Sequence, residues 1–317
     1  MNKRSLFLVV LLVMIISLLG ACQTEEVAQK ESEVDSKPVI YSSFYPIHFM
    51  TEYIGGERID AQTVVPKDNE VHGYEISPRK MADLEDADAL FYVGLELEPW
   101  ADRVVENLSG ADVPTIKVSE GLELLEDHDD HGHDDHGHDD HDHHSHGEYD
   151  PHLWTDPIKM QEIATTIKKE LIELDKEGEE EFKENYQSLI SELKDLADKY
   201  ESTLADRNSD HFIVSHSAFA YLADRYGLEE LSISGITPHE EPSTHRIAEL
   251  IKKAEEYDLD YVFLEVLAAP EVAEVLAEEA GLEVLTLDPI GGLADEDDDY
   301  FLIMERNLEN LKKELVK

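Results

Sequence analysis

The sequence predicts an α/β fold with two lobes, each with a mostly parallel four-stranded sheet flanked by helices, joined by one long rigid helix. Short β-type runs alternate with helix-patterned segments in both halves of the chain, and one uninterrupted amphipathic stretch separates the halves. Such alternation favours parallel sheets with helices on their faces. The 317 residues, 41% of them hydrophobic, are enough for two lobes.

Four β-type runs fall in each half. The predicted strands span 39–44, 61–65, 89–94 and 115–119, and then 211–216, 231–234, 261–266 and 282–288. The predicted helices between them span 77–87, 99–108, 218–226, 243–257 and 270–280. Ser77 is a typical helix N-cap, and Pro78 suits the first helical position.

The connecting helix is predicted over 179–207. Its apolar residues recur every three or four positions, and they are Phe182, Tyr186, Leu189, Leu193, Leu196 and Tyr200. No Pro or Gly follows Gly178 in this stretch, so one long helix with a core-facing stripe is expected to act as a stiff connector. The predicted division is an N-terminal lobe over 38–175, a linking helix over 176–207 and a C-terminal lobe over 208–317.

The first residues are typical of an export signal. Lys3 and Arg4 precede an apolar run of 14 residues, which is shorter than the roughly 20 residues of a spanning helix and typical of a secretory signal. The following Leu-Gly-Ala-Cys resembles a bacterial lipobox, which predicts a signal peptide over 1–21 and a lipid on Cys22, the only cysteine. A polar, flexible tether is predicted over 22–37. The chain is therefore expected to be extracytoplasmic and lipid-anchored to the cell membrane; the alternative is a plain secretory signal with an incidental cysteine.

The formal net charge of −48 excludes a general nucleic-acid binder, because phosphate would be repelled. Two interpretations of the acidic excess remain. It attracts cations toward the protein, or it adapts the surface to a salty habitat in which salt screens self-repulsion. We favour the second interpretation for most of this charge.

A histidine-rich segment over 127–147 interrupts the first half. It contains no apolar residue, so it cannot offset the entropy of ordering and is predicted to be a disordered surface loop. Its nine histidines are His128, His131, His133, His136, His138, His141, His143, His144 and His146. The alternative to a metal-related role is a solvated polyelectrolyte without function.

Candidate metal ligands follow the predicted strands. His72 comes just after the second strand, and His216 and Asp288 end later strands. Ligands of open α/β sheets bind beyond the carboxyl ends of the strands. Together with His152 in Asp-Pro-His-Leu-Trp, these residues offer three imidazoles and one carboxylate, a tetrahedral set that suits Zn²⁺. Taken singly, each histidine is more often structural, and no local spacing links the positions.

Four motifs carry a resemblance to a known family. They are VPKDNEVHGYEISPRKMADLEDADALFYVGLELEPW at 65–100, DPHLWTDP at 150–157, VSHSAFAYLADRYGL at 214–228 and SGITPHEEPS at 234–243. In order and context they resemble the zinc-binding solute-binding lipoproteins of bacterial ABC importers, the ZnuA/AdcA type. The resemblance covers the chain from about Val39 onward. It implies two lobes with the metal in the cleft between them, and His72, His152 and His216 as ligands.

The fourth ligand is less constrained by the resemblance. Asp288 in TLDP is the preferred residue, and Glu265 in VFLEV is either the alternative fourth ligand or an acceptor that supports a ligand. The manganese-binding homologues have a carboxylate at the position of His216, so this histidine argues for zinc. His239 departs from similar sequences, which usually have an acidic or polar residue there. We expect a solvated loop histidine, with an auxiliary contact as the alternative.

The resemblance implies a binding protein, not an enzyme. It would act as a monomer, capture Zn²⁺ outside the cytoplasm and deliver it to the permease of an ABC transporter. The histidine-rich loop would be an auxiliary metal collector, since many weak sites on a tether raise the local metal concentration. The alternatives are a manganese-binding homologue, a zinc hydrolase and a surface adhesin; the sequence shows no HExxH pair or nucleophile motif for hydrolysis. His48 could line the cleft but is expected to pack, and His211 and His245 are expected to be structural or exposed.

Overall fold

The computed structural model describes residues 37–126, 148–239, 241–267 and 270–317. The predicted signal peptide, Cys22, all of the tether except Lys37, and the histidine-rich segment 127–147 lie outside the described residues. Pro38–Lys317 form one structural unit. Among the described residues, no helix combines the length and the apolar composition that crossing a membrane requires.

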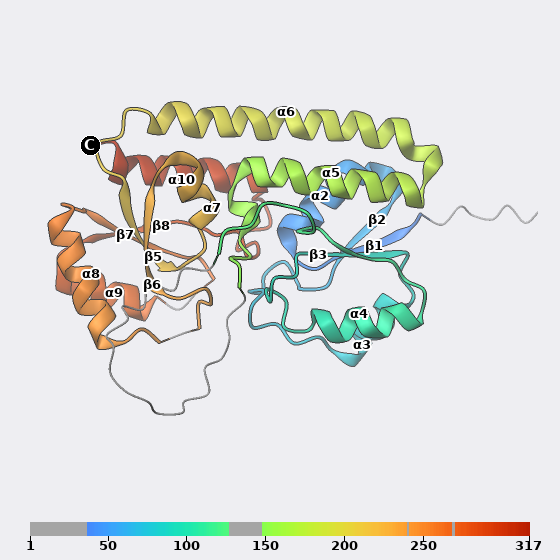
Figure 1. Cartoon of the computed structure of the whole chain (residues 1–317), viewed down its shortest axis with the longest axis horizontal. Coiled ribbons are helices and arrows are strands. Elements are labelled where there is room, and N and C mark those ends of the chain that lie inside the picture. The colour runs from blue at the N-terminus through green and yellow to red at the C-terminus, as the bar shows by residue number, and fades with distance from the viewer. Residues whose placement is uncertain (1–36, 127–147, 240, 268–269) are drawn as a thin grey trace, which may run out of the picture. The chain divides into compact units, whose positions relative to one another are not determined.

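Two sheets of four parallel strands organise two lobes (Figure 1). Their strand orders are β2-β1-β3-β4 and β6-β5-β7-β8, so the second lobe repeats the topology of the first. The bounds are β1 (Val39–Ser42), β2 (Asp60–Thr63), β3 (Ala89–Tyr92), β4 (Thr115–Lys117), β5 (His211–His216), β6 (Glu229–Ser234), β7 (Tyr261–Leu264) and β8 (Glu283–Thr286). The predicted parallel four-stranded sheets are confirmed. The prediction that Asp288 ends a strand is wrong, because β8 ends two residues earlier.

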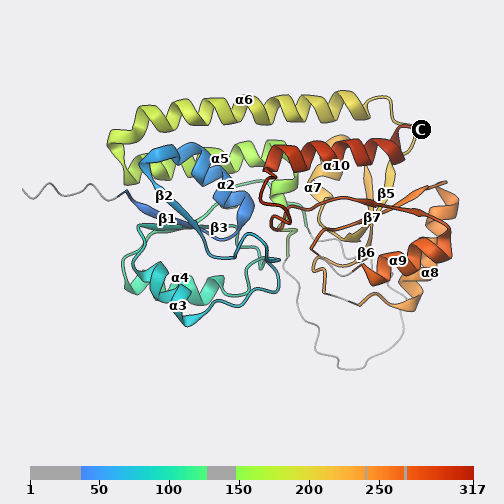
Figure 2. The ribbon, with the colours of Figure 1, turned by 180° about the vertical axis from the view of Figure 1, so that it is seen from behind.

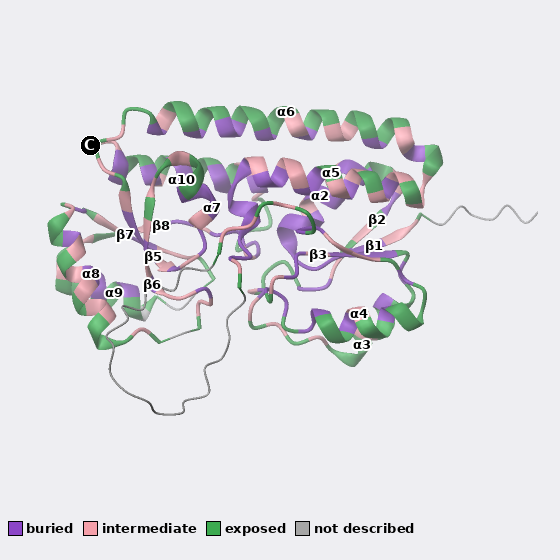
Figure 3. Ribbon diagram, in the orientation of Figure 1, coloured by how far each residue is buried: buried purple, intermediate pink, exposed green. Residues whose placement is uncertain are grey.

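Helices cover the sheets and join the lobes. Their bounds are α2 (Tyr45–Gly55), α3 (Pro78–Glu85), α4 (Ala101–Gly110), α5 (Pro157–Leu174), α6 (Glu179–Leu204), α7 (Ala220–Tyr226), α8 (Thr244–Glu256), α9 (Glu271–Ala280) and α10 (Tyr300–Leu315). The Ser77 hydroxyl accepts a hydrogen bond from the Lys80 N–H at 3.2 Å, which confirms it as the cap of α3. The sequence analysis did not name α2, α5 or α10. Figure 3 shows buried residues along the sheets and exposed ones over much of α3, α4 and α8.

The long helix α6 is predicted correctly but ends at Leu204 instead of 207. It packs on α2, α5 and α10 (Figure 2), and its stripe from Phe182 to Tyr200 includes fully buried aromatic side chains. The connector is therefore part of a helical layer rather than a free rod. Such a layer resists bending more than a single helix would, because bending must disturb packing at several faces.

Direct contacts also join the lobes below this helical layer. The Trp154 indole N–H donates to the Pro289 carbonyl at 2.5 Å, and the Tyr300 hydroxyl donates to the Trp154 carbonyl at 2.9 Å. Arg225 Nε is 2.6 Å from both carboxylate oxygens of Asp156, whose Oδ1 also caps α5. These bonds are largely buried and link segments far apart in the sequence, so they position the start of α5 against the second lobe.

Replacing Tyr300 with Phe tests this junction. The Tyr300→Phe variant keeps the ring but leaves the buried Trp154 carbonyl without its donor, so the free energy of unfolding should fall by about 1–3 kcal/mol. Urea denaturation of the metal-free protein measures this loss. Tyr186→Phe is the control, because its hydroxyl bonds the Thr165 hydroxyl at the surface, and it should change stability by less than about 0.5 kcal/mol. Equal effects of both substitutions would contradict the role given to Tyr300.

Candidate metal centre

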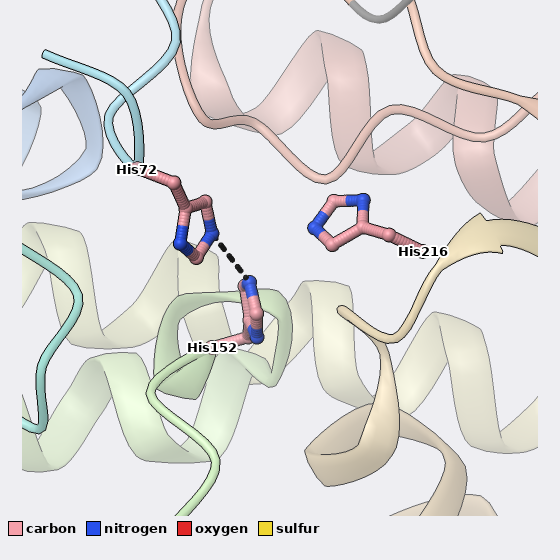
Figure 4. A group of neighbouring side chains, drawn as sticks. All are labelled: His72, His152 and His216. Atoms are coloured by element: carbon pink, nitrogen blue, oxygen red, sulfur yellow. Dashed lines mark hydrogen bonds between the residues drawn. The ribbon is translucent and has the colours of Figure 1, made fainter. Parts of the chain in front are cut away.

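Three histidines from distant parts of the chain meet in one group (Figure 4). His72 lies in the loop after β2, His152 lies just before a short 3-10 helix (Leu153–Thr155), and His216 is the last residue of β5. One ring nitrogen from each histidine lies within 4.8 Å of the other two. His72 Nε2 and His152 Nε2 are 3.1 Å apart. The structure therefore brings together the three histidines that the sequence analysis selected.

Carboxylates two residues upstream hold the first two histidines. The Glu70 carboxylate accepts the backbone N–H of His72 at 2.8 Å and that of Gly73 at 3.0 Å. The Asp150 carboxylate accepts the backbone N–H of His152 at 2.7 Å. The same spacing, an acidic residue and then histidine two positions on, thus gives the same side-chain-to-backbone hydrogen bond twice. Sequence analysis missed these two supporting residues, although this repeated spacing was visible.

The ring orientations follow from bonds to the Nδ1 atoms. Asp150 Oδ1 accepts from His152 Nδ1 at 2.9 Å, and Glu265 Oε1 accepts from His216 Nδ1. A proton held on Nδ1 leaves the Nε2 lone pair of each ring free to bind a metal. His216 Nε2 is buried and has no hydrogen-bond partner among the described residues. This unpaired acceptor faces the other two histidines and is suited to a cation.

The surroundings shift the pKa values of two histidines in opposite directions. Burial, and then the neighbouring rings of His152 and His216, lower the pKa of His72 well below its usual value. Burial also opposes protonation of His216, but the adjacent Glu265 carboxylate outweighs it and raises the pKa of His216. Protons therefore compete with a metal less at His72 than at His216, whose protonated form Glu265 favours.

Asp288 and Glu265 line the same cavity as the three histidines. Neither carboxylate belongs to the group whose ligand atoms lie within 4.8 Å of one another in the described part of the chain. Asp288 Oδ1 instead accepts the Ile290 N–H at 2.7 Å, which turns it toward its own backbone. Burial, and secondarily the charge of Glu265, raise the pKa of Asp288 to about 6. A cation in the cavity would offset the cost of this buried negative charge.

The cavity is small. The cavity volume is about 20 Å³, which is enough for one water molecule or one ion. Pockets for organic ligands are about 300–1,000 Å³. Apolar groups of Trp154, Leu267 and Pro289 complete the lining. The site is therefore shaped for a bare ion.

The other histidines named from the sequence lie outside this group. His48 is buried in α2, with Nε2 3.5 Å from Glu52, and does not line the cavity. His211 stacks on Tyr257 at a centroid distance of 3.6 Å, and His245 is exposed on α8. His239 is exposed but is not isolated, because its Nε2 lies 3.4 Å from Glu70.

Comparison with known proteins gives the family. The model of the zinc-uptake complex component A, periplasmic, matches residues 40–314. The chain belongs to this family, ZnuA. Among its relatives, the zinc-binding protein AdcA of Streptococcus pyogenes is 32% identical over 314 residues, covering 96% of this chain. The high-affinity zinc uptake system protein ZnuA of Bacillus subtilis is 31% identical over 303 residues, 94% of either chain. Neither name describes an enzyme.

Solved structures of this family share the fold. The AdcAII protein of Streptococcus pneumoniae has a TM-score of 0.77 and 31% identity, covering 88% of this chain and 99% of its own. The Zn(II)-bound ZnuA-like domain of AdcA from the same species has a TM-score of 0.74 and 30% identity, covering 89% and 100%. This ZnuA-family chain spans only 61% of the length of the streptococcal AdcA relatives.

Replacing Asp288 with Asn tests how much the buried charge of Asp288 destabilises the metal-free protein. The folded-state pKa of Asp288 is raised from 3.8 to about 6, so its contribution to stability is full below pH 3.8 and is lost as pH rises through 6. Asp288→Asn, which does not titrate, should therefore stabilise the metal-free protein at pH 8 by about 3 kcal/mol, and have little effect near pH 4.

Urea denaturation with a chelator present, at both pH values, measures this difference. Asp297→Asn is the matched control, since Asp297 is exposed in the same loop and should show no pH-dependent gain. A loss of stability at pH 8 in Asp288→Asn would show that the buried charge is already compensated by the protein.

Proposed function

We propose that this chain is the extracytoplasmic, high-affinity zinc-binding component of an ABC transporter. It captures Zn²⁺ between the lobes and delivers the ion to a membrane permease. The observation that carries the proposal is the convergence of three imidazole rings on a buried, ion-sized cavity. Membership of the ZnuA family supports it independently. His72, His152 and His216 are the proposed ligands, and Asp288 is the proposed fourth.

Zinc suits this donor set better than manganese does. Zn²⁺ binds imidazole nitrogen at about 2.0–2.1 Å, so two ligands on one tetrahedral ion lie about 3.3 Å apart. The 3.1 Å between His72 Nε2 and His152 Nε2 is close to that separation. Manganese prefers oxygen ligands, and a set dominated by imidazole disfavours it.

Asp288 can complete the set by a movement of its side chain. Its Oδ1 is committed to Ile290, but its second carboxylate oxygen has no such backbone bond within the described part of the chain, and its side chain already lines the cavity. Glu265 is less suited to the role, because Nδ1 and Nε2 lie on different sides of an imidazole ring, so a carboxylate that accepts from His216 Nδ1 lies away from an ion at Nε2. A carboxylate in the fourth position would close the site, and with the small cavity this argues against a zinc hydrolase, which keeps an open position for water.

Release of the ion requires the two lobes to separate locally. His72 and His152 belong to the first lobe, whereas His216 and Asp288 belong to the second. The junction bonds at Trp154 and the helical layer under α6 oppose a wide hinge. We infer a modest motion that withdraws the second-lobe ligands when the protein meets its permease.

The remaining parts of the proposal concern the segments outside the described residues. Cys22 would carry the lipid that holds the protein to the membrane, and the related AdcA of Streptococcus pneumoniae is named a zinc-binding lipoprotein. The segment 127–147 would collect zinc near the cavity, because it ends only a few residues before His152 in the sequence. The protein would act as a monomer.

Adhesion is a second candidate function, favoured by one comparison. A solved structure from Streptococcus agalactiae with a TM-score of 0.76 is titled a laminin-binding protein with adhesin and metal-transporting activity. Binding of the full chain to immobilised laminin, with and without zinc, tests this function separately from metal capture.

Removing a ligand tests the zinc site. His72→Ala and His216→Ala should each lower zinc affinity by more than about 100-fold, since losing a residue that only orients a ligand already costs 10–100-fold. Titration calorimetry with zinc and manganese measures the affinities, and manganese should bind the unsubstituted protein much more weakly. His245→Ala, an exposed histidine of the second lobe, is the control and should bind zinc normally. Unchanged affinity in His216→Ala would falsify the assignment.

Deleting 128–146 separates the two classes of metal site. The shortened protein should lose the additional weak zinc equivalents and retain one tight site, because the proposed ligands all lie outside this segment. The stoichiometry of the same calorimetric titration measures the change. Loss of the tight site on deletion would mean that the histidine-rich segment, and not the cavity, is the principal zinc binder.

A further inference from the structure

His239 forms a contact between the lobes beside the metal cavity. It lies in the segment between β6 and α8, and its side chain is 66% exposed. Its Nε2 is 3.4 Å from Glu70 Oε2, in the first-lobe loop that carries His72. The carboxylate and the imidazole thus come from opposite lobes and meet at a place that solvent reaches.

Glu70 connects this contact to the inner histidines. Its side chain is only 18% exposed and is fixed by the backbone N–H groups of His72 and Gly73. One oxygen, Oε1, lies 4.0 Å from His72 Nε2, whereas Oε2 faces His239. Each carboxylate oxygen has two acceptor sites, so each can bind a cation while keeping its backbone bond. Glu70 therefore presents one oxygen to His72 and the other to His239.

The approach of His239 depends on glycine at position 73. A Cβ at Gly73 would lie 2.9 Å from His239 Nε2 and 3.8 Å from Glu70 Oε2. The imidazole therefore occupies the space that a side chain would fill. Because the backbone holds Glu70 and Gly73 leaves room for the ring, the two donor atoms meet with little loss of side-chain freedom on the carboxylate side.

We propose that Glu70 and His239 form an outer zinc-binding site through which the ion passes to the three inner histidines. The 3.4 Å between the two donor atoms matches the roughly 3.3 Å expected for two ligands of one tetrahedral zinc. With only two protein ligands, the ion keeps water in its other positions and is held weakly. It moves inward when Glu70 Oε1 and His72 Nε2, 4.0 Å apart, replace His239 and water. This proposal rests on the zinc-capture function proposed above.

The rates of zinc capture and zinc release by the full chain test the outer site. Stopped flow at pH 7.5 measures capture with free zinc and release with a competing chelator. His239→Ala should slow capture and release by the same factor, on the order of tenfold, because loss of one of its two protein ligands weakens the intermediate at least as much as the 10–100-fold cost of losing a residue that only orients a ligand. The zinc affinity is the ratio of the capture rate to the release rate. It should stay unchanged, because an intermediate on the path speeds capture and release equally. His245→Ala is the matched control, since both substitutions remove one exposed histidine of the second lobe.

Two results would overturn the outer site. Equal rates in His239→Ala and His245→Ala would show that His239 takes no part in transfer. Faster release with unchanged capture would show that His239 merely latches the lobes together. If the unsubstituted protein itself bound no zinc tightly, the proposed function would fail instead. Zinc-edge diffraction from crystals of the full chain gives an independent check, with a peak expected between Glu70 Oε2 and His239 Nε2 that disappears in His239→Ala.

Discussion

The site depends on one electrostatic constraint: three neutral imidazoles must present ring nitrogens to the same small space, where an ion would replace the hydrogen bond between His72 Nε2 and His152 Nε2. Asp150 and Glu265 meet it for two rings by accepting from Nδ1. Burial favours the neutral form of the third, His72, by lowering its pKa. Leaving a buried acceptor such as His216 Nε2 unpaired costs about 1–3 kcal/mol, and a cation is the partner that recovers this cost.

The duplicated topology places these rings opposite one another. Each sheet has the same strand order, with its first strand in the interior of the sheet. His216 ends β5, the first strand of the second sheet, and His72 follows β2 in the first sheet. Because parallel strands all deliver their following loops to one edge, each lobe brings its ligand loops to the side that faces the cavity. The helical layer of α5, α6 and α10 then keeps these two edges in register.

Much of the fold was predictable from the sequence, because alternating β-type and helical segments are local patterns. Helix α2 was harder to recognise, since Tyr45, Ile47 and Met50 are buried on several sides and give no single apolar stripe. The stripe of α5, with Ile163, Ile167 and Leu171, was visible but was not used. The helices α5 and α10 matter because they pack against the connecting helix α6. Sequence periodicity alone predicted α6 as a single helix without such support.

The ligand set was predictable only in part. The three histidines were selected through motifs, and the acidic residues two positions before His72 and His152 could have been found from spacing. Glu265 was named as an acceptor for a ligand or as a ligand itself, but its pairing with His216 could not be predicted, because 49 residues separate them and only the register of β5 with β7 brings them together. The position of the Asp288 side chain is harder still to predict, since its orientation depends on an Asx-type hydrogen bond from the Ile290 N–H after the end of β8.

The segment that follows Asp288 bonds the two halves of the site to each other. The Leu293 N–H donates to the Lys67 carbonyl at 2.5 Å, and the Pro289 carbonyl accepts from Trp154. The loop that carries Asp288 is thus bonded to the loop before His72 and to the residue two positions after His152. A Cβ at Gly292 would lie 2.6 Å from the Lys67 carbonyl oxygen, so the contact is close as well as bonded. Opening the site must either break these bonds, at about 0.5–1.5 kcal/mol each, or carry Asp288 with the first lobe while His216 withdraws with β5.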